Sequence, residues 1–492
     1  MKRMNKYLLL TALLSVAGAT YAQDSYDAQT FANSDLNGSA RFVAMGGALG
    51  ALGGDVSVMS TNPAGTGMYR SSDASISFSG LFTGKGAMGH DGTRMSLDQG
   101  GVLIAFDMDN PTSKGLQFVN FGVNYQKKRN YLFNQKTDIN NLGGIFSQTY
   151  QIADLCNYAY ANDYWGTIAD MSASKDGVHG SILDETVDYG YAGLPSEKAY
   201  FEKATFGGNV QADVNLSFNF NDQFFLGASV GVYDIDYNRE SFYQEVGSDG
   251  NVYDFTNWYK TEGDGFDVKL GFICRPIEES PFRFGVTIHT PTWYRMTDSN
   301  GSDLFLNDGY LSSGNNGEYD YRFRTPWKFG VSLGHTIANK FAIGAEYEFQ
   351  DMSTVHYNEV DGYNSDYFRN MNRINEETLR GQHTLKVGAE FKPIDELSFR
   401  VGYNYVSSPF KKDAFRTIGY DGPYTETDYT NWGAINRFTV GLGYRYKGGY
   451  VDLAWQYQAQ KGDFYAFDDV DLKPTKINAN RSQLMATFGF RF

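Results

Sequence analysis

The chain has 492 residues and a formal net charge of −15, and 16% of its residues are aromatic, with 55 Gly but only 11 Pro. An acidic chain of this composition argues against nucleic acid as a partner. Two isolated cysteines, Cys156 and Cys274, and six scattered histidines give no metal-ligand spacing, so we expect no cofactor and no metal.

The first 22 residues predict a secretory signal peptide. Lys2, Arg3 and Lys6 precede the apolar run 7–19, and Ala22 ends a small-residue cleavage site. The run is too short to cross a bilayer, and no later segment has the roughly 20 apolar residues of a membrane helix. The sequence therefore predicts an exported product without a membrane helix.

Residues 23–72 form a small, apolar, glycine-rich stretch that does not alternate as a strand does. The apolar residues Phe42, Met45, Leu49 and Leu52 recur at three- and four-residue spacing, which favours a short helix. Gly53-Gly54 and Asn62-Pro63 then break the chain into turns. We predict a compact plug, or hatch, with short helices inside a barrel, and we expect Asn62, Pro63 and Ala64 to fix it against the barrel wall.

Residues 73–492 predict the barrel itself, because segments of about ten alternating residues recur to the end of the chain. The average sequence stays polar, with a mean hydropathy of −0.43, since only every second strand residue would face lipid. The predicted fold class is all-β, a 14-stranded antiparallel transmembrane β-barrel. The expected strands are 73–82, 100–109, 116–126, 208–220, 223–237, 264–276, 281–290, 325–337, 340–352, 383–393, 396–407, 435–446, 450–459 and 483–492.

The connections between these strands alternate in length, as they do in outer-membrane barrels with short periplasmic turns and long external loops. The last segment also places Phe at every second position up to Phe492, as an outer-membrane barrel strand does. We therefore predict a multi-pass barrel in the bacterial outer membrane, in contact with outer-membrane lipid. The expected short turns are 110–115, 221–223, 277–280, 338–340, 394–396 and 447–449, and the expected long polar loops are 127–203, 238–263, 291–324, 353–382, 408–434 and 460–482.

Strand 396–407 shows how the faces divide: alternation places Phe399 and Val401 toward lipid, and Ser398 and Arg400 inside. The same pattern brings charges of both signs into the lumen, where they can pair across strands and against the hatch. The other expected lumenal charges are Arg283, Glu346, Glu348, Lys386, Glu390, Arg437, Arg445 and Asp452.

The chain resembles the FadL/TodX family of outer-membrane transporters of long-chain fatty acids and other hydrophobic compounds. The features that carry the resemblance are Asn62-Pro63-Ala64 within the glycine-rich hatch and repeated strand phrases such as 265–271, 282–286, 325–330, 387–393 and 437–444. The resemblance implies a monomeric fourteen-stranded barrel, an N-terminal hatch, ligand capture at external loops and sideways exit through the wall. It places the lateral opening on strand 116–126, where Gly122 is the candidate gate residue, although a glycine there also suits lumen packing.

Two roles remain open for the hatch residues and for Arg400. The apolar side chains of Phe42, Met45, Leu49, Leu52, Val56 and Met59 would line a ligand site or pack the hatch against the wall. Arg400 would meet a fatty-acid carboxylate, or pair with lumenal glutamates.

We expect no enzyme, since no nucleophile elbow precedes a helix. The predicted function is transport of small hydrophobic molecules, long-chain fatty acids or similar, with hatch movement and lateral exit. The alternative is a barrel of this family that serves as a structural subunit of an outer-membrane secretion or assembly complex. Protein partners would then dock on Tyr-rich loops such as 157–164, because Tyr is enriched at interfaces.

Overall fold

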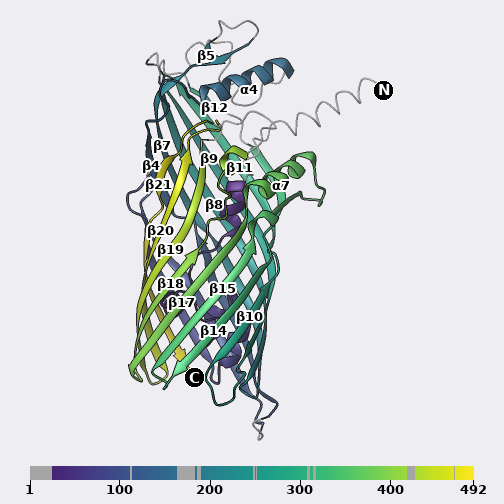
Figure 1. Ribbon diagram of the computed structural model, residues 1–492, viewed down its shortest axis with the longest axis vertical. Coiled ribbons are helices and arrows are strands. Elements are labelled where there is room, and N and C mark those ends of the chain that lie inside the picture. The colour runs from purple at the N-terminus through teal and green to yellow at the C-terminus, as the bar shows by residue number, and fades with distance from the viewer. Residues whose placement is uncertain are drawn as a thin grey trace, which may run out of the picture.

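The computed structural model describes residues 25–110, 114–162, 183–184, 190–247, 250, 252–306, 311–313, 317–417, 427–469 and 471–492. One antiparallel sheet closes on itself, because β1 (Asp73–Phe82) pairs with both β2 and the last strand, β22 (Arg481–Arg491) (Figure 1). This confirms the predicted 14-stranded barrel with its N-terminal hatch. The other strands of the ring are β2 (Thr93–Asp107), β3 (Leu116–Asn130), β7 (Ser196–Phe220), β8 (Phe224–Gly247), β9 (Val252–Cys274), β10 (Arg283–His289), β14 (Lys328–Ile337), β15 (Phe341–Asp351), β17 (Gly381–Ile394), β18 (Leu397–Val406), β19 (Tyr429–Tyr446) and β20 (Gly449–Tyr465).

The short turns lie where alternation predicts them, at the end of the barrel that carries the C-terminus, the lower end in Figure 1; residues 111–113 of the turn 110–115 lie outside the described residues. Asn221 and Asp222 both have positive φ, 59° and 55°, between β7 and β8. Two such residues form the tight turn that matches strand twist, and Asn and Asp tolerate this conformation best. The hairpin register is therefore fixed from the lower end.

At the upper end, the prediction of long polar loops is wrong for 127–203, 238–263 and 291–324. Strands β7, β8 and β9 run 23 to 25 residues, and further strands pair with β7, with β9, with β20 or with each other above the ring. These are β4 (Phe133–Ile139), β11 (Trp293–Leu306), β12 (Leu311–Ser313), β13 (Gly317–Arg324), β16 (His356–Glu359) and β21 (Thr475–Asn478), with a small separate pair, β5 (Leu183–Asp184) and β6 (Ala192–Gly193).

The upper wall differs from the prediction because its polarity is reversed. In β8 the apolar side chains of Val230 and Val232 are exposed on the outer face, whereas the next apolar side chains, Tyr233 and Ile235, are buried on the inner face. Asp234 then takes the outward position. Side chains still alternate between the two faces of the strand, but above Val232 the apolar side chains lie on the inner face. The outer face above Val232 carries charged side chains.

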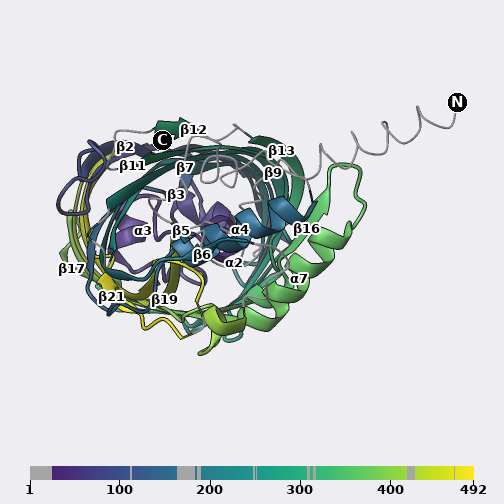
Figure 2. The ribbon, with the colours of Figure 1, turned by 90° about the horizontal axis from the view of Figure 1, so that it is seen from above.

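Two helices close the upper end, α4 (Thr149–Asn162) across the mouth and α7 (Asp366–Thr378) at its rim (Figure 2). The N-terminus of α7 is capped by Ser365, whose side chain accepts from Phe368 N. Within the described part of the chain, every helix is too short or too polar to cross a membrane. Two short 3₁₀ turns, η3 (Met352–Thr354) and η4 (Ala414–Thr417), complete the rim.

The chain before β1 runs down the lumen from the upper to the lower end, as the purple segment of Figure 1 shows. It forms α2 (Ser25–Ala32), α3 (Ala40–Ala44) and the 3₁₀ turns η1 (Val56–Ser60) and η2 (Pro63–Met68). The predicted helix through Leu52 is wrong, because the helix ends at Ala44 and Gly46 and Gly47 take positive φ. The proposed signal peptide, residues 1–22, lies outside the described residues.

A belt of glycines on the lumenal wall lets the backbone of the hatch touch the strands. Gly334, Gly344, Gly388 and Gly402 are register partners on four neighbouring strands. A Cβ on Gly388 would lie 2.2 Å from Met45 O. Glycine permits this close approach of two backbones. The belt therefore holds the lower part of the hatch, residues 40–68, where side chains would push it away; its other members are Gly101, Gly122, Gly227, Gly271 and Gly441.

Candidate functional site

The upper lumen is filled by an aromatic cluster, defined here by Phe31, Tyr131, Tyr233, Tyr237, Tyr259, Tyr294, Tyr321, Phe323, Tyr357 and Phe368. Helix α2 inserts Phe31 into it. The Phe31 ring meets Tyr131, Tyr237 and Phe323 edge-on, at centroid distances of 6.5, 5.6 and 6.3 Å. Edge-on packing is a favoured arrangement of aromatic rings, so the N-terminal helix occupies an apolar site that is built from the wall.

A central chamber of about 110 Å³ adjoins this cluster on the side of the hatch. Tyr233 belongs to both, since its ring is part of the cluster and the residue also lines the chamber. Phe42 and Asp35 come to the chamber from the hatch. Most of the other lining residues are polar or charged, so the apolar site and a charged one meet at Tyr233.

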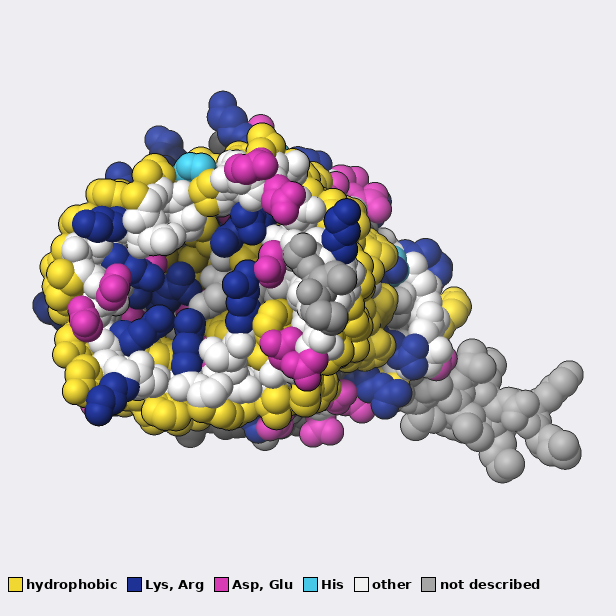
Figure 3. Space-filling view, turned by 90° about the horizontal axis from the view of Figure 1, so that it is seen from below, with side chains coloured by type: hydrophobic (Ala, Val, Ile, Leu, Met, Phe, Trp, Pro, Cys, Tyr) yellow, Lys and Arg dark blue, Asp and Glu magenta, His cyan; other side chains and the backbone are white. Residues whose placement is uncertain are grey.

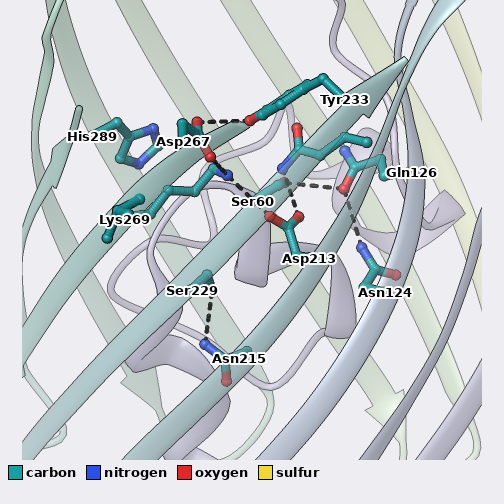
Figure 4. Close-up of polar contacts among 12 residues, drawn as sticks. Ser60, Asn124, Gln126, Asp213, Asn215, Ser229, Tyr233, Asp267, Lys269 and His289 are labelled. Atoms are coloured by element: carbon teal, nitrogen blue, oxygen red, sulfur yellow. Dashed lines mark hydrogen bonds and ion pairs between the residues drawn. The ribbon is translucent and has the colours of Figure 1, made fainter. Parts of the chain in front are cut away.

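Buried ion pairs hold the chamber walls (Figure 4). Lys269 Nζ lies 2.6 Å from Asp267 Oδ1 and 3.0 Å from Asp213 Oδ1, and Tyr233 Oη donates to Asp267 at 2.7 Å. A Cβ on Gly231 would lie 2.6 Å from both Lys269 Nζ and Asp267 Oδ1, so a glycine there leaves room for the group. His289 Nε2 lies 2.7 Å from the hatch carbonyl of Thr61. These pairs tie the wall to itself and to the hatch.

Across the lumen, Lys386 Nζ lies 2.7 Å from carboxylate oxygens of both Glu346 and Glu348. Glu346 also accepts from Gly50 N of the hatch at 3.0 Å. Arg437 donates to Asn404 and Gln458 at 2.9 and 2.8 Å. Most of the lumenal charges predicted from alternation are thus paired with each other and with the hatch, whereas Arg283 and Arg445 form no ion pair among the described residues.

Two chamber lysines differ, because neither Lys128 nor Lys328 has a carboxylate within ion-pair distance among the described residues. The ammonium group of Lys128 lies over the Tyr233 ring, 4.4 Å from its centroid, and within 3.4 Å of Tyr294 Oη. Lys128 and Lys328 also repel each other. Asp267 attracts Lys128 but is already paired with Lys269. Glu348 interacts with Lys328 but is paired with Lys386. An anion between the two lysines would further offset their repulsion.

Asp35 fastens the hatch beside the chamber. It pairs with Arg481, lies 3.8 Å from Arg437 Nη2, and accepts from Asn130 N at 3.0 Å. Burial opposes the charge on Asp35, but Arg481, Arg129 and Arg437 outweigh it and hold the pKa of this carboxyl below its ordinary value. The hatch is therefore bound to the upper wall by an ionised carboxylate.

The structure separates the residues proposed from sequence as a ligand site. Phe42 lines the central chamber, whereas Leu52, Val56 and Arg400 line a second cavity at the lower end. Arg400 Nε lies 2.6 Å from Glu390, and Arg400 also pairs with Asp452. A ligand role for this set stays a prediction, and its remaining members, Met45, Leu49 and Met59, are fully buried in hatch packing.

The hatch motif joins two parts of the hatch and touches the wall. Asn62 Oδ1 accepts from Ala64 N at 3.2 Å, its Nδ2 donates to Gly50 O at 2.9 Å, and Pro63 begins η2. A Cβ on Gly227 of the wall would meet the carbonyl of Pro63 at 2.4 Å.

The β-sheet register is unbroken at Gly122, where a Cβ would lie 2.1 Å from Met59 Cε. The absence of a side chain at Gly122 therefore leaves room for the Met59 side chain of the hatch. A gating role for Gly122 stays a prediction. Of the Tyr-rich segment 157–164, residues 157–162 belong to α4 and the rest lies outside the described residues.

Sequence reasoning missed Lys128 and Lys328, although alternation contains the signal for both. Trp327 and Phe329 face outward, so Lys328 between them faces inward. Lys128 continues the inward series of Asn124 and Gln126, but the expected strand stopped at 126, before the lysine.

No protein-family model matches the chain, and no curated protein sequence was found to be similar to it. Solved structures do match. The Pseudomonas putida toluene transporter TodX has 12% identity and a TM-score of 0.53, and the match covers 93% of this chain and 99% of that one. A Pseudomonas aeruginosa FadL homologue has 13% identity and a TM-score of 0.50, covering 94% and 98%, and the monoaromatic hydrocarbon channel CymD has 10% and 0.51, covering 92% and 97%. The resemblance to the FadL/TodX channels is thereby confirmed as one of fold, a fourteen-stranded barrel whose lumen holds an N-terminal hatch.

Proposed function

We propose that this barrel is an outer-membrane channel for small hydrophobic molecules that carry an acidic head group, long-chain fatty acids or similar. The observation that carries the proposal is the junction at Tyr233, where the aromatic cluster meets a chamber with two lysines that form no ion pair with any carboxylate of the described residues. The aromatic cluster would bury an apolar chain, which is the main source of affinity. Lys128 and Lys328 would bind the carboxylate.

The fold neighbours support the hydrophobic part of this proposal, since TodX is a toluene transporter and CymD a monoaromatic hydrocarbon channel. The lysines distinguish an acid from a neutral hydrocarbon, which would leave both charges unpaired. The exposed apolar band on the lower wall, with the charged exterior above Val232, supports a membrane location with the long upper wall outside the cell.

The binding test uses the mature chain in detergent, with palmitate and its neutral analogue 1-hexadecanol as probes and native mass spectrometry or calorimetry as the readout. In the double variant Lys128→Met, Lys328→Met, palmitate affinity should fall by about tenfold or more, since hydrogen bonds to charged groups are worth about 1.5–3 kcal/mol. Hexadecanol binding should not change. Lys85→Met, at an exposed loop position, is the matched control. Equal palmitate binding by the double variant and wild type would overturn the acid specificity.

A lateral exit between β2 and β3 is the second part of the proposal. The two strands are hydrogen-bonded from the pair Asp107 and Phe118 at the lower end up to the pair Gln99 and Gln126. Above that level, β2 pairs with β1 alone, and β3 pairs with β7 alone. The hatch covers the upper seam, because Asp35 N donates to Lys128 O at 2.9 Å and Asn37 Nδ2 donates to Lys127 O at 3.1 Å. Withdrawal of this hatch segment would open the wall sideways.

The exit is tested by cross-linking the seam in cells. Cysteines at Leu97 and Lys127, in a background lacking the two native cysteines, are joined with a short bis-maleimide, and uptake of labelled palmitate is measured. Uptake should stop when the seam is bridged. A bridge across the regular β18–β19 seam, between cysteines at Val401 and Val440, is the control. Uptake through a bridged β2–β3 seam would refute the lateral path.

A further inference from the structure

A second cavity, which we call the lower vestibule, opens at the end of the barrel that carries the short turns. It measures about 370 Å³ and lies between the hatch and the wall. Seen from below, the hollow is ringed by dark blue Lys and Arg side chains inside the yellow apolar wall (Figure 3). Seven cations line it, namely Arg41 from the hatch and Arg283, Lys340, Lys392, Arg400, Arg445 and Arg491 from the barrel.

Only part of this charge is neutralised within the protein. Glu390 is shared by three cations: Arg400 Nε at 2.6 Å, Arg41 Nε at 3.3 Å and Lys392 Nζ at 3.5 Å. Arg491 Nε lies 2.8 Å from Asp73. Arg400 also pairs with Asp452, and Asp55, Asp395 and Glu396 line the cavity as well, so five carboxylates face seven cations in the vestibule.

Two guanidinium groups of the vestibule form no ion pair in the described part of the chain, although Arg283 Nη1 donates to Leu52 O at 2.9 Å. Among the described residues, neither Arg445 nor Arg283 has a carboxylate within ion-pair distance, and Arg283 Nε is buried without a hydrogen-bond acceptor. Arg491 and Arg41 repel Arg445 while Asp452 attracts it, and Glu390 attracts Lys392 while Arg41 and Arg445 repel it. Since the whole chain carries −15, this concentration of positive charge runs against the overall charge of the protein.

We infer that the lower vestibule is a binding site for a small water-soluble anion bearing carboxylate or phosphate groups, held by Arg445 and Lys392. A guanidinium group binds such oxyanions through two parallel hydrogen bonds, and an ammonium group adds a second charge. Arg41 brings the hatch to the same site, because Arg41 Nη1 also donates to Gly54 O at 2.7 Å. A bound anion therefore joins the hatch to the wall and stabilises the closed position of the hatch.

This site is separate from the central chamber, and its test does not depend on the transport proposal. Inorganic phosphate and citrate are titrated into the mature barrel in detergent, at constant ionic strength, with hydrogen exchange of residues 40–56 as the readout. Both probes should slow exchange in a saturable manner. A third probe, soluble dihexanoyl phosphatidylglycerol, presents the same phosphate group on a lipid. Comparing its effect with that of free phosphate shows whether the site binds a lipid head group or a free anion.

Arg445→Gln and Lys392→Gln should each weaken the anion effect by about tenfold or more. Arg295→Gln, at an exposed arginine on the upper wall, is the matched control and should bind as wild type. Because Arg445→Gln and Lys392→Gln each retain a polar side chain, both variants should fold, and folded barrels are recognised on gels because their migration changes on heating. The inference fails if none of the probes has a saturable effect, or if Arg445→Gln responds as wild type does.

Discussion

Replacing Gly388 by alanine should loosen the hatch, because the belt of glycines is where hatch and wall touch through their backbones. The new Cβ would lie 2.2 Å from Met45 O, about 1 Å closer than the 3.4 Å at which ordinary contact begins. The neighbour is a backbone oxygen and not a flexible side-chain end, so rotation of a side chain does not relieve the clash. Either the hatch moves away from β17 or the strand bends.

The cost follows from overpacking in a close-packed interior, which is about 1–3 kcal/mol for extra methylene groups. We expect Gly388→Ala to lower the free energy of unfolding by that amount and to raise hydrogen exchange in residues 40–54. Gly402→Ala should act alike, since its Cβ would lie 2.3 Å from Gly46 N. The two changes should not be additive, because Gly388 and Gly402 are register partners.

The assays are urea unfolding in detergent, hydrogen exchange and single-channel conductance in planar bilayers, where a displaced hatch should raise conductance. Gly100→Ala on β2 is the control, because a Cβ at Gly100 meets nothing within 4 Å. If Gly388→Ala matches the control in all three measurements, the hatch is not held by close backbone contact and our account of its position is wrong.

Three further outcomes are expected. Lys386→Met leaves two buried glutamates without their cation and should lower the free energy of urea unfolding by about 3–5 kcal/mol, with Lys85→Met as the neutral control. The pKa of Asp35 is lowered in the folded state, so the ionised carboxylate stabilises the fold fully above its unfolded pKa of about 3.9, and this stabilisation is lost as pH falls through the folded pKa. The difference in free energy of unfolding between wild type and Asp35→Asn should therefore be constant from pH 5 to 7 and shrink in more acidic buffer. Phe31→Ala removes the ring that fills the aromatic cluster, at a cost of about 3–5 kcal/mol to helix docking, so palmitate affinity measured by calorimetry should rise; a fall would make Phe31 a ligand contact instead of a competitor.

Strand alternation predicted the fourteen strands and the short turns because hydrocarbon outside and polar groups inside impose the same pattern on every strand. Phe399 and Val401 outside and Arg400 inside are examples. Above Val232 the outer face is polar and the inner face is apolar: Asp234 faces water outside, and Tyr233 faces the lumen. A polar outer face resembles a loop when only hydrophobicity is considered, and the upper wall was missed for this reason.

The sequence predicted that the hatch lies inside the barrel but did not predict its local structure. The spacing of Phe42, Met45 and Leu49 is helical, yet Gly46 and Gly47 turn the chain, and the three side chains meet in one cluster through tertiary packing. Lys128 and Lys328 come together only across the lumen. Contacts between distant strands of a barrel depend on its closure, which a single sequence does not display.

The contacts of the hatch divide it into two parts that should differ in mobility. Residues 40–68 are held by backbone contact with the glycine belt and by buried polar groups such as Asn62. Helix α2 is held mainly through side chains: Phe31 enters the aromatic cluster, and Ser25 donates to Asn375 of α7 at 2.8 Å. In addition, Arg129 of β3 donates to the carbonyls of Gln29 and Thr30. Displacing α2 breaks fewer buried backbone contacts than displacing the lower hatch, so opening should begin in the segment 25–39, at α2, and extend to residues 33–39 once the bonds of Asp35 and Asn37 to the wall also break. That segment covers both the aromatic cluster and the upper β2–β3 seam, so a solute that displaces it would reach the lateral path while the lower vestibule stays closed.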